Sequence, residues 1–187
     1  MANRNTQGFG LVPAGTLGQT PATSGTGKYK IESNSSTTIF QGGAVASSGG
    51  YIVEGQGTAD NPMIGVLNGI FYNAATTLKP TFSNHYVQVT PANSEDIDAF
   101  VFDNPQQQYV VATDDSVAQS GYLETYDMNT SAGSTTTGKS SATLDIGDTS
   151  ADAASFRLLR SAEDPENDEN AAFRSVVVCI NLIELQS

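Results

Sequence analysis

Short apolar runs separated by turn-forming residues recur along most of the chain. Runs rich in Val, Ile, Phe and Tyr alternate with stretches of Gly, Ser, Thr, Asn and Pro, and helical periodicity is weak throughout. β-Branched and aromatic residues favour strands, and frequent turns between short strands are typical of sandwiches and barrels. We therefore expect an all-β fold, a single β-sandwich or β-barrel domain of about ten to twelve short strands with an extended N-terminal arm.

Two hairpins and one irregular strand are expected within this pattern. The Ser-Ser-Gly-Gly segment at 47–50 has hairpin-turn chemistry, and the turn at 104–108 combines asparagine with proline between two apolar runs. Gly65 and Gly69 interrupt a long apolar stretch and predict a bulge or a bend. The expected strands are 29–31, 37–40, 44–46, 51–54, 63–72, 86–89, 99–103, 109–112, 122–126, 141–144, 155–160 and 175–185.

The charge of the chain is low in density, strongly acidic and unevenly distributed. Charged residues make up 15 % of the chain, against about 25 % in an average domain. The chain has 8 basic and 20 acidic residues, for a net charge of −12, yet residues 1–50 contain three basic residues and one acidic residue. Because no basic patch is present to release counterions, we expect no direct contact with nucleic acid.

Residues 1–27 are expected to form an extended N-terminal arm, and residues 28–187 an all-β body. Six glycines and two prolines punctuate the arm, and no periodic apolar pattern is present. The free-energy cost of ordering so long a segment exceeds what burial of its few apolar side chains returns. We therefore expect the arm to lie on the body or, preferably, to grip a neighbouring subunit as an added strand. Its expected partner-binding residues are Phe9, Leu11, Val12, Pro13 and Leu17.

The sequence lacks the common motifs for catalysis and for cofactor binding. It has one histidine, His85, and one cysteine, Cys179, and contains none of the usual nucleophile, zinc-protease or phosphate-loop patterns. Cys179 lies in an apolar run and is expected to be a small buried side chain. We therefore expect a protein that is not an enzyme, with no cofactor and no metal site of the zinc type.

Acidic residues gather in three places, at 163–170, 95–98 and 114–115. We expect these clusters to be solvated loops, since the spaced ligand pattern of a calcium loop is absent. Two alternatives stay open, namely calcium binding at 163–170 and an acidic pair in a cleft that hydrolyses glycosidic bonds. The hydroxyl-rich segment 131–141 is expected to be a surface loop or a loop that becomes ordered at a subunit contact.

Four short motifs resemble a group of capsid-associated structural proteins of marine tailed bacteriophages. They are NTQGFGLVP at 5–13, DNPQQQY at 103–109, STTTG at 134–138 and VVVCIN at 176–181. The resemblance implies a capsid decoration (cement) protein, commonly a homotrimer, that binds the major capsid protein on the outer surface of the phage head and stabilises it. It also implies an arm that adds a strand to the capsid, and a location on the virion after synthesis in the host cytoplasm.

Other classes of protein stay open on the sequence alone. A receptor- or carbohydrate-binding β-domain of a tail or fibre would present exposed aromatic side chains, and another head or tail structural protein would share the same composition. A hydrolase with an acidic pair would need a cleft. No apolar run is long enough to span a bilayer and no targeting segment is visible, so we expect no membrane partner.

Overall fold

The computed structural model of the chain is built almost entirely from strands. It describes residue 3 and residues 5–18, 25–56, 62–130, 133–147, 154–168, 170–181 and 183–186. Within these residues it contains twelve strands, the 3₁₀ helices η1 (Ala92–Ser94), η2 (Gln119–Gly121) and η3 (Glu184–Gln186), and no α-helix. The expected all-β fold is confirmed, since two open antiparallel sheets of six strands each are consistent with a β-sandwich.

The first sheet combines one N-terminal strand with the strands of the C-terminal half. It contains β1 (Val12–Thr16), β8 (Gln107–Ala112), β9 (Thr125–Asn129), β10 (Thr143–Asp145), β11 (Phe156–Ser161) and β12 (Ser175–Ile180). Its order is β1-β8-β12-β11-β9-β10. Every neighbouring pair in this order is antiparallel, and β1, at one end of the order, is an edge strand of the sheet.

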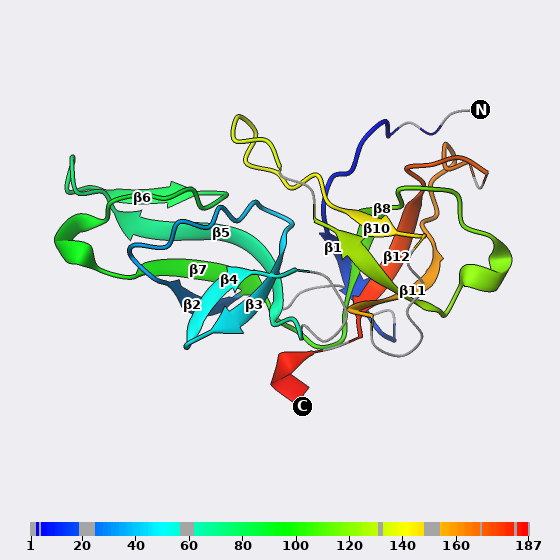
Figure 1. Ribbon diagram of the computed structural model, residues 1–187, viewed down its shortest axis with the longest axis horizontal. Helices are drawn as coiled ribbons and strands as arrows, with labels where there is room; N and C mark the ends of the chain where they lie inside the picture. Colours follow the sequence, from blue (N-terminus) through cyan, green and yellow to red (C-terminus); the bar gives the residue numbers. More distant parts are fainter. Residues whose placement is uncertain are drawn as a thin grey trace.

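The second sheet is formed by the strands between these two parts of the chain. It contains β2 (Gly27–Ile31), β3 (Ala44–Ser48), β4 (Tyr51–Glu54), β5 (Gly65–Asn73), β6 (Pro80–Ser83) and β7 (Ile97–Phe102). Its order is β2-β7-β5-β3-β4, with β6 paired to β5. The end strands β2 and β4 contact each other, so this sheet curls toward closure. Figure 1 shows the two sheets at opposite ends of the long axis of the molecule.

Each sheet covers its own cluster of buried apolar side chains. In the second sheet, β7 turns Ile97, Ala99 and Val101 into the core and leaves the residues between them partly exposed. A strand with one buried face requires this period of two. The first sheet covers a larger cluster, to which Met63 and Val66 also belong although they lie in or beside the second sheet. The first core therefore joins the two sheets.

One expected hairpin is confirmed and the other is wrong. β3 and β4 pair through Ser48 and Tyr51, and Gly49 and Gly50 form the turn between them with φ angles of +60° and +88°. The strands β7 and β8 flank the expected turn at 104–108 but do not pair with each other. Instead β7 pairs with β2 and β5 in one sheet, and β8 pairs with β1 and β12 in the other. The turn therefore carries the chain from the second sheet to the first.

Two other expected strands, at 37–40 and 86–89, are reduced to a single bridge between Ile39 and Tyr86. Both side chains are buried, and the Tyr86 hydroxyl donates a hydrogen bond of 2.7 Å to the carbonyl oxygen of Ser35. These segments contain strand-forming residues because they anchor a loop to the core. Burial, rather than membership of a sheet, accounts for their apolar pattern.

The described part of the N-terminal segment lies on its own chain. β1 pairs with β8 of the same chain, and Leu11 is only 1 % exposed, within the core of the first sheet. Asn3 is also buried, and its side-chain nitrogen donates hydrogen bonds to the carbonyl oxygens of Ala171 (3.2 Å) and Ala172 (2.9 Å). Residues 19–24 lie outside the described part of the chain.

This arrangement changes the expected division into an arm at 1–27 and a body at 28–187. The described part of the arm contributes an edge strand to the first sheet, and β2 already begins at Gly27. The backbone hydrogen bonds between β1 and β8 help to offset the cost of ordering the segment, and they form within one chain. The grip on a neighbouring subunit stays a prediction.

Candidate functional site

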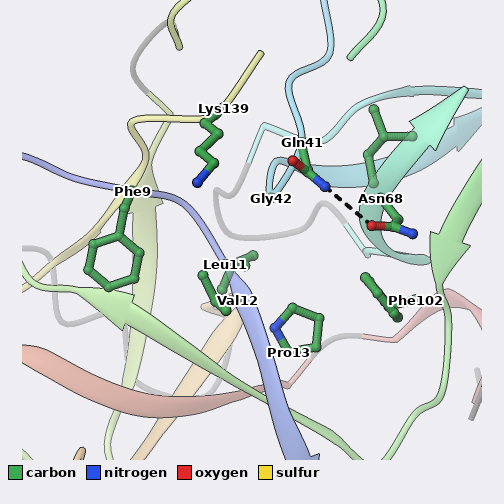
Figure 2. A pocket seen from close by; sticks show the side chains of 10 residues that line it. Phe9, Leu11, Val12, Pro13, Gln41, Gly42, Asn68, Phe102 and Lys139 are labelled. Atoms are coloured by element: carbon green, nitrogen blue, oxygen red, sulfur yellow. Dashed lines mark hydrogen bonds between the residues drawn. The ribbon is translucent and has the colours of Figure 1, made fainter. Parts of the chain in front are cut away.

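A groove of about 430 Å³ lies where the N-terminal segment passes between the two sheets. Five separate parts of the chain line it: the residues before β1 and at its start, the residues before β3, the middle of β5, the end of β7 and the loop between β9 and β10 (Figure 2). The lining residues are Phe9, Leu11, Val12, Pro13, Gln41, Gly42, Leu67, Asn68, Phe102 and Lys139.

Four of the five residues expected to bind a partner line this groove. Leu11 is buried, Phe9 and Pro13 are half-buried, and Val12 is 47 % exposed. Leu17 is 44 % exposed, in the turn that follows β1, and does not line the groove. The N-terminal wall of the groove is therefore a continuous apolar segment, fixed at its base by the burial of Leu11.

Two glycines allow the N-terminal segment to approach the second sheet. The main-chain nitrogen of Leu11 donates to the carbonyl oxygen of Gly42 at 2.8 Å, and the nitrogen of Gly42 donates to the carbonyl oxygen of Leu67 at 2.9 Å. Gly42 has a φ of +80°, and a Cβ atom there would lie 3.1 Å from the Leu11 oxygen. Gly10 has a φ of +74°, and its Cβ atom would lie 2.8 Å from the Gly42 oxygen. Both positions therefore require glycine.

The side-chain amides of Gln41 and Asn68 form the opposite, polar wall, and Asn84, outside the lining, bonds to Gln41. The Nε2 atom of Gln41 donates to Oδ1 of Asn68 at 3.3 Å, and Nδ2 of Asn84 donates to Oε1 of Gln41 at 3.4 Å (Figure 2 shows the first of these bonds). Asn84 also donates to the carbonyl oxygen of Thr137 at 2.8 Å. An apolar surface with a few fixed polar groups is the usual composition of a binding pocket.

Lys139 supplies the only charge among the lining residues. Its main chain is held by Gln41, whose nitrogen donates to the Gly138 oxygen and whose oxygen accepts from the Ser140 nitrogen, both at 2.9 Å. The Lys139 side chain is exposed, makes no ion pair with a described residue, and extends toward the N-terminal wall in Figure 2. On a chain of net charge −12, the groove thus presents a local positive charge beside an apolar surface.

The hydroxyl-rich loop that carries the lysine is held on its own chain. Of the segment 131–141, residues 133–141 are described. His85 acts on the loop through Asn84, which donates to the Thr137 oxygen: its Nδ1 atom lies 2.9 Å from Oδ1 of Asn84, and its ring stacks on Phe40 with centroids 5.9 Å apart. Contacts within the chain therefore hold the described part of the loop in place. The single histidine, His85, helps to position Asn84, which bonds to the loop.

The acidic clusters do not converge on a metal site in the described part of the chain. Among these residues, no group of three or more His, Cys, Asp or Glu side chains is placed to hold a metal ion. Asp98 instead forms ion pairs with Lys28 at 2.7 Å and Lys30 at 2.6 Å. Glu169, within the cluster at 163–170, lies outside the described residues, so the calcium alternative there is not tested.

Cys179 is buried, as the sequence predicts. Burial raises the pKa of its thiol, and the nearby Arg157 opposes this only in part. A buried thiol of raised pKa is a poor nucleophile. As for a membrane, none of the helices found in the described residues has the length and apolar character to cross one.

No family model, curated protein or solved structure matches the chain. The resemblance of its four motifs to phage head proteins therefore stays a prediction, and the groove is the main structural evidence on function. Reasoning from the sequence missed the wall formed by Gln41, Asn68 and Lys139. One signal was available for Lys139, which is the only lysine or arginine between Lys79 and Arg157.

Proposed function

We propose that this chain is a structural protein of a tailed-phage head, a decoration protein that binds the outer surface of the capsid shell and stabilises it. One observation carries the proposal: of the four motifs that resemble phage head proteins, one lines the groove and two others adjoin lining residues in sequence. The motif at 5–13 contributes four lining residues, the motif at 103–109 follows the lining residue Phe102, and the motif at 134–138 precedes Lys139. A motif of this class that lines the groove, with two more beside its lining residues, favours a binding site there.

The charge and composition of the molecule suit this role. A net charge of −12 keeps copies apart before assembly and disfavours binding to nucleic acid. The proposed partner is the major capsid protein, and the proposed assembly is a homotrimer on the capsid surface of the virion. Linking three groove contacts in a trimer converts weak single contacts into strong attachment. Catalysis is not part of the proposal.

Co-sedimentation with shells tests the proposal. The purified chain is titrated against empty, expanded capsids of the phage that encodes it, and the pelleted complex is imaged by electron cryomicroscopy. We expect binding that saturates at many copies per shell, with density on the outer surface between or on the capsomers. Absence of binding, together with a low copy number confined to the tail of intact virions, would contradict it.

A second candidate function rests on an aromatic pair of the second sheet, the exposed Phe82 and the half-buried Phe100. Phe82 in β6 is 63 % exposed, and its ring centroid lies 6.3 Å from that of Phe100 in β7. Exposed aromatic rings favour the alternative of a carbohydrate-binding domain of a tail or fibre, because the apolar faces of sugars stack on them. Binding of the wild-type chain on a glycan array, lost in Phe82→Ala, would support this candidate, and an array without signal would count against it.

A further inference from the structure

We propose that the groove binds an extended segment of the shell subunit that inserts an apolar side chain beside Val12 and Phe102 and places a carboxylate against Lys139. This inference rests on the proposed function, because the shell subunit is its partner. It goes further by stating the chemistry of the segment that is recognised, an apolar residue next to Asp or Glu.

The size and lining of the groove fit a short piece of chain. A volume of about 430 Å³ lies in the lower part of the range of roughly 300–1,000 Å³ that is typical of ligand pockets. The exposed Val12 and the half-buried Phe9 and Phe102 form apolar surface that an incoming side chain can cover. Removal of this surface from water provides the non-directional part of the binding energy.

Side chains, rather than a new backbone ladder, carry the recognition. β1 is the edge strand nearest the groove, and an added strand would need regular donors along it. Pro13 has no N–H group to donate, and the pairing of β1 with β8 shifts register between Pro13 and Gly15. Proline and bulges on an edge strand disfavour addition of another strand. The expectation that this strand augments a capsid strand is therefore not part of the proposal.

Charge complementarity selects the segment. Lys139 is the only charged residue of the lining, and no carboxylate lines the groove. The remainder of the chain is strongly acidic, so a carboxylate of the partner is repelled at most other surfaces and attracted here. At physiological salt the attraction acts over roughly 8 Å, which restricts it to the groove. Charges at the rim of an interface mainly set specificity and association rate.

Two pairs of matched variants test the inference with expanded empty capsids as the probe. Lys139→Glu reverses the charge of the groove, and Lys79→Glu makes the same reversal at an exposed lysine in the β5–β6 turn. Val12→Glu places a carboxylate in the groove, and Val87→Glu does so at an exposed valine elsewhere. Far-UV circular dichroism and thermal unfolding confirm that each variant folds.

We expect Lys139→Glu and Val12→Glu to bind shells at least about tenfold more weakly than the wild-type chain. Lys79→Glu and Val87→Glu should stay within about twofold of the wild type, as expected for substitutions outside the interface. Lys139→Gln should weaken binding less than Lys139→Glu and should reduce the dependence of the affinity on salt concentration. Groove variants that bind as tightly as their controls would overturn the inference and leave the proposed function standing.

Overlapping peptides that cover the shell subunit identify the segment. We expect the peptides that bind the wild-type chain in fluorescence polarisation to contain an apolar residue next to Asp or Glu, and to lose binding when that acid is replaced by its amide. Binding only by peptides without an acidic residue overturns the inference. A wild-type chain that does not bind shells at all overturns the proposed function and the inference together.

Discussion

The main-chain nitrogen of Leu11 donates a hydrogen bond of 2.8 Å to the carbonyl oxygen of Gly42. This bond joins the residue before β1, in the first sheet, to the residues that lead into β3, in the second. Leu11 also buries its side chain in the core and lines the groove. The N-terminal segment is thus a structural element of the body and a wall of the candidate site at the same time.

Shortening Leu11 should destabilise the fold rather than merely release an arm. We expect Leu11→Ala to lower the free energy of unfolding by about 2–5 kcal/mol, because it leaves a cavity at a fully buried position. Val12→Ala, at the exposed neighbour, should change it by less than about 0.5 kcal/mol. Urea unfolding followed by circular dichroism measures both. Equal stability of the two variants would show that the segment detaches in solution.

Because Gly42 lies close to the Leu11 oxygen, replacing it with alanine should destabilise the fold more than replacing another glycine of positive φ. Gly49 has a φ of +60° and open space around its Cβ position, so Gly49→Ala should cost only the backbone strain of about 1–2 kcal/mol. Gly42→Ala adds a tight contact with the Leu11 oxygen at 3.1 Å and should cost at least about 1 kcal/mol more. Thermal unfolding of the two variants gives the comparison, and a smaller effect at Gly42 would refute the role given to this contact.

The ion pairs of Asp98 should make stability depend on acid pH. Burial acts to raise the pKa of Asp98, but Lys28 and Lys30 outweigh it and hold this pKa below its ordinary value. The stabilisation is therefore present above the pKa of an unfolded aspartate, about 3.9, and is lost as the pH falls through the lower pKa of the folded state.

Asp98→Asn should consequently lower the free energy of unfolding by about 1 kcal/mol at neutral pH, a modest value because both lysines are largely exposed. The difference from the wild type should shrink at acid pH, as the pH falls through the lowered pKa of the folded state and the wild-type carboxyl takes up a proton. Urea titrations at the two pH values measure this. Glu163→Gln, at an exposed acid, is the control and should show little effect at either pH. A penalty independent of pH would mean that the ion pairs do not stabilise the fold.

The thiol of Cys179 should be protected by the fold. It is 9 % exposed, and burial raises its pKa, so the reactive thiolate is scarce at neutral pH. We expect slow reaction with a thiol-specific dye in buffer and complete, rapid reaction in concentrated urea. Rapid labelling of the native chain would indicate that β12 opens readily.

Features set by neighbouring residues were predictable from the sequence. The turn at Gly49 and Gly50 follows from their tolerance of positive φ. The two glycines in β5 predicted an irregularity, and the register of β5 against β7 shifts between Leu67 and Gly69. Period-two burial in β7 follows from the alternation of apolar residues.

Features set by distant parts of the chain were not predictable. The Asn-Pro turn after Phe102 has the residues of a hairpin turn, yet β7 and β8 join different sheets. Which strand each of them pairs with depends on all the other strands of the fold, and a local pattern does not contain that information. β1 contains Pro13 and lacks an apolar run, so its pairing with β8 left no local signal. The groove combines five segments, and for this reason Gln41, Asn68 and Lys139 could not be associated before the fold was known.

The opposite walls of the groove belong to different sheets, with Val12 in one and Asn68 and Phe102 in the other. A chain segment seated there would contact both sheets of an elongated molecule and bridge the boundary between them. The protein would then resist bending more strongly when occupied than when free, so part of its stiffness would arise only on assembly.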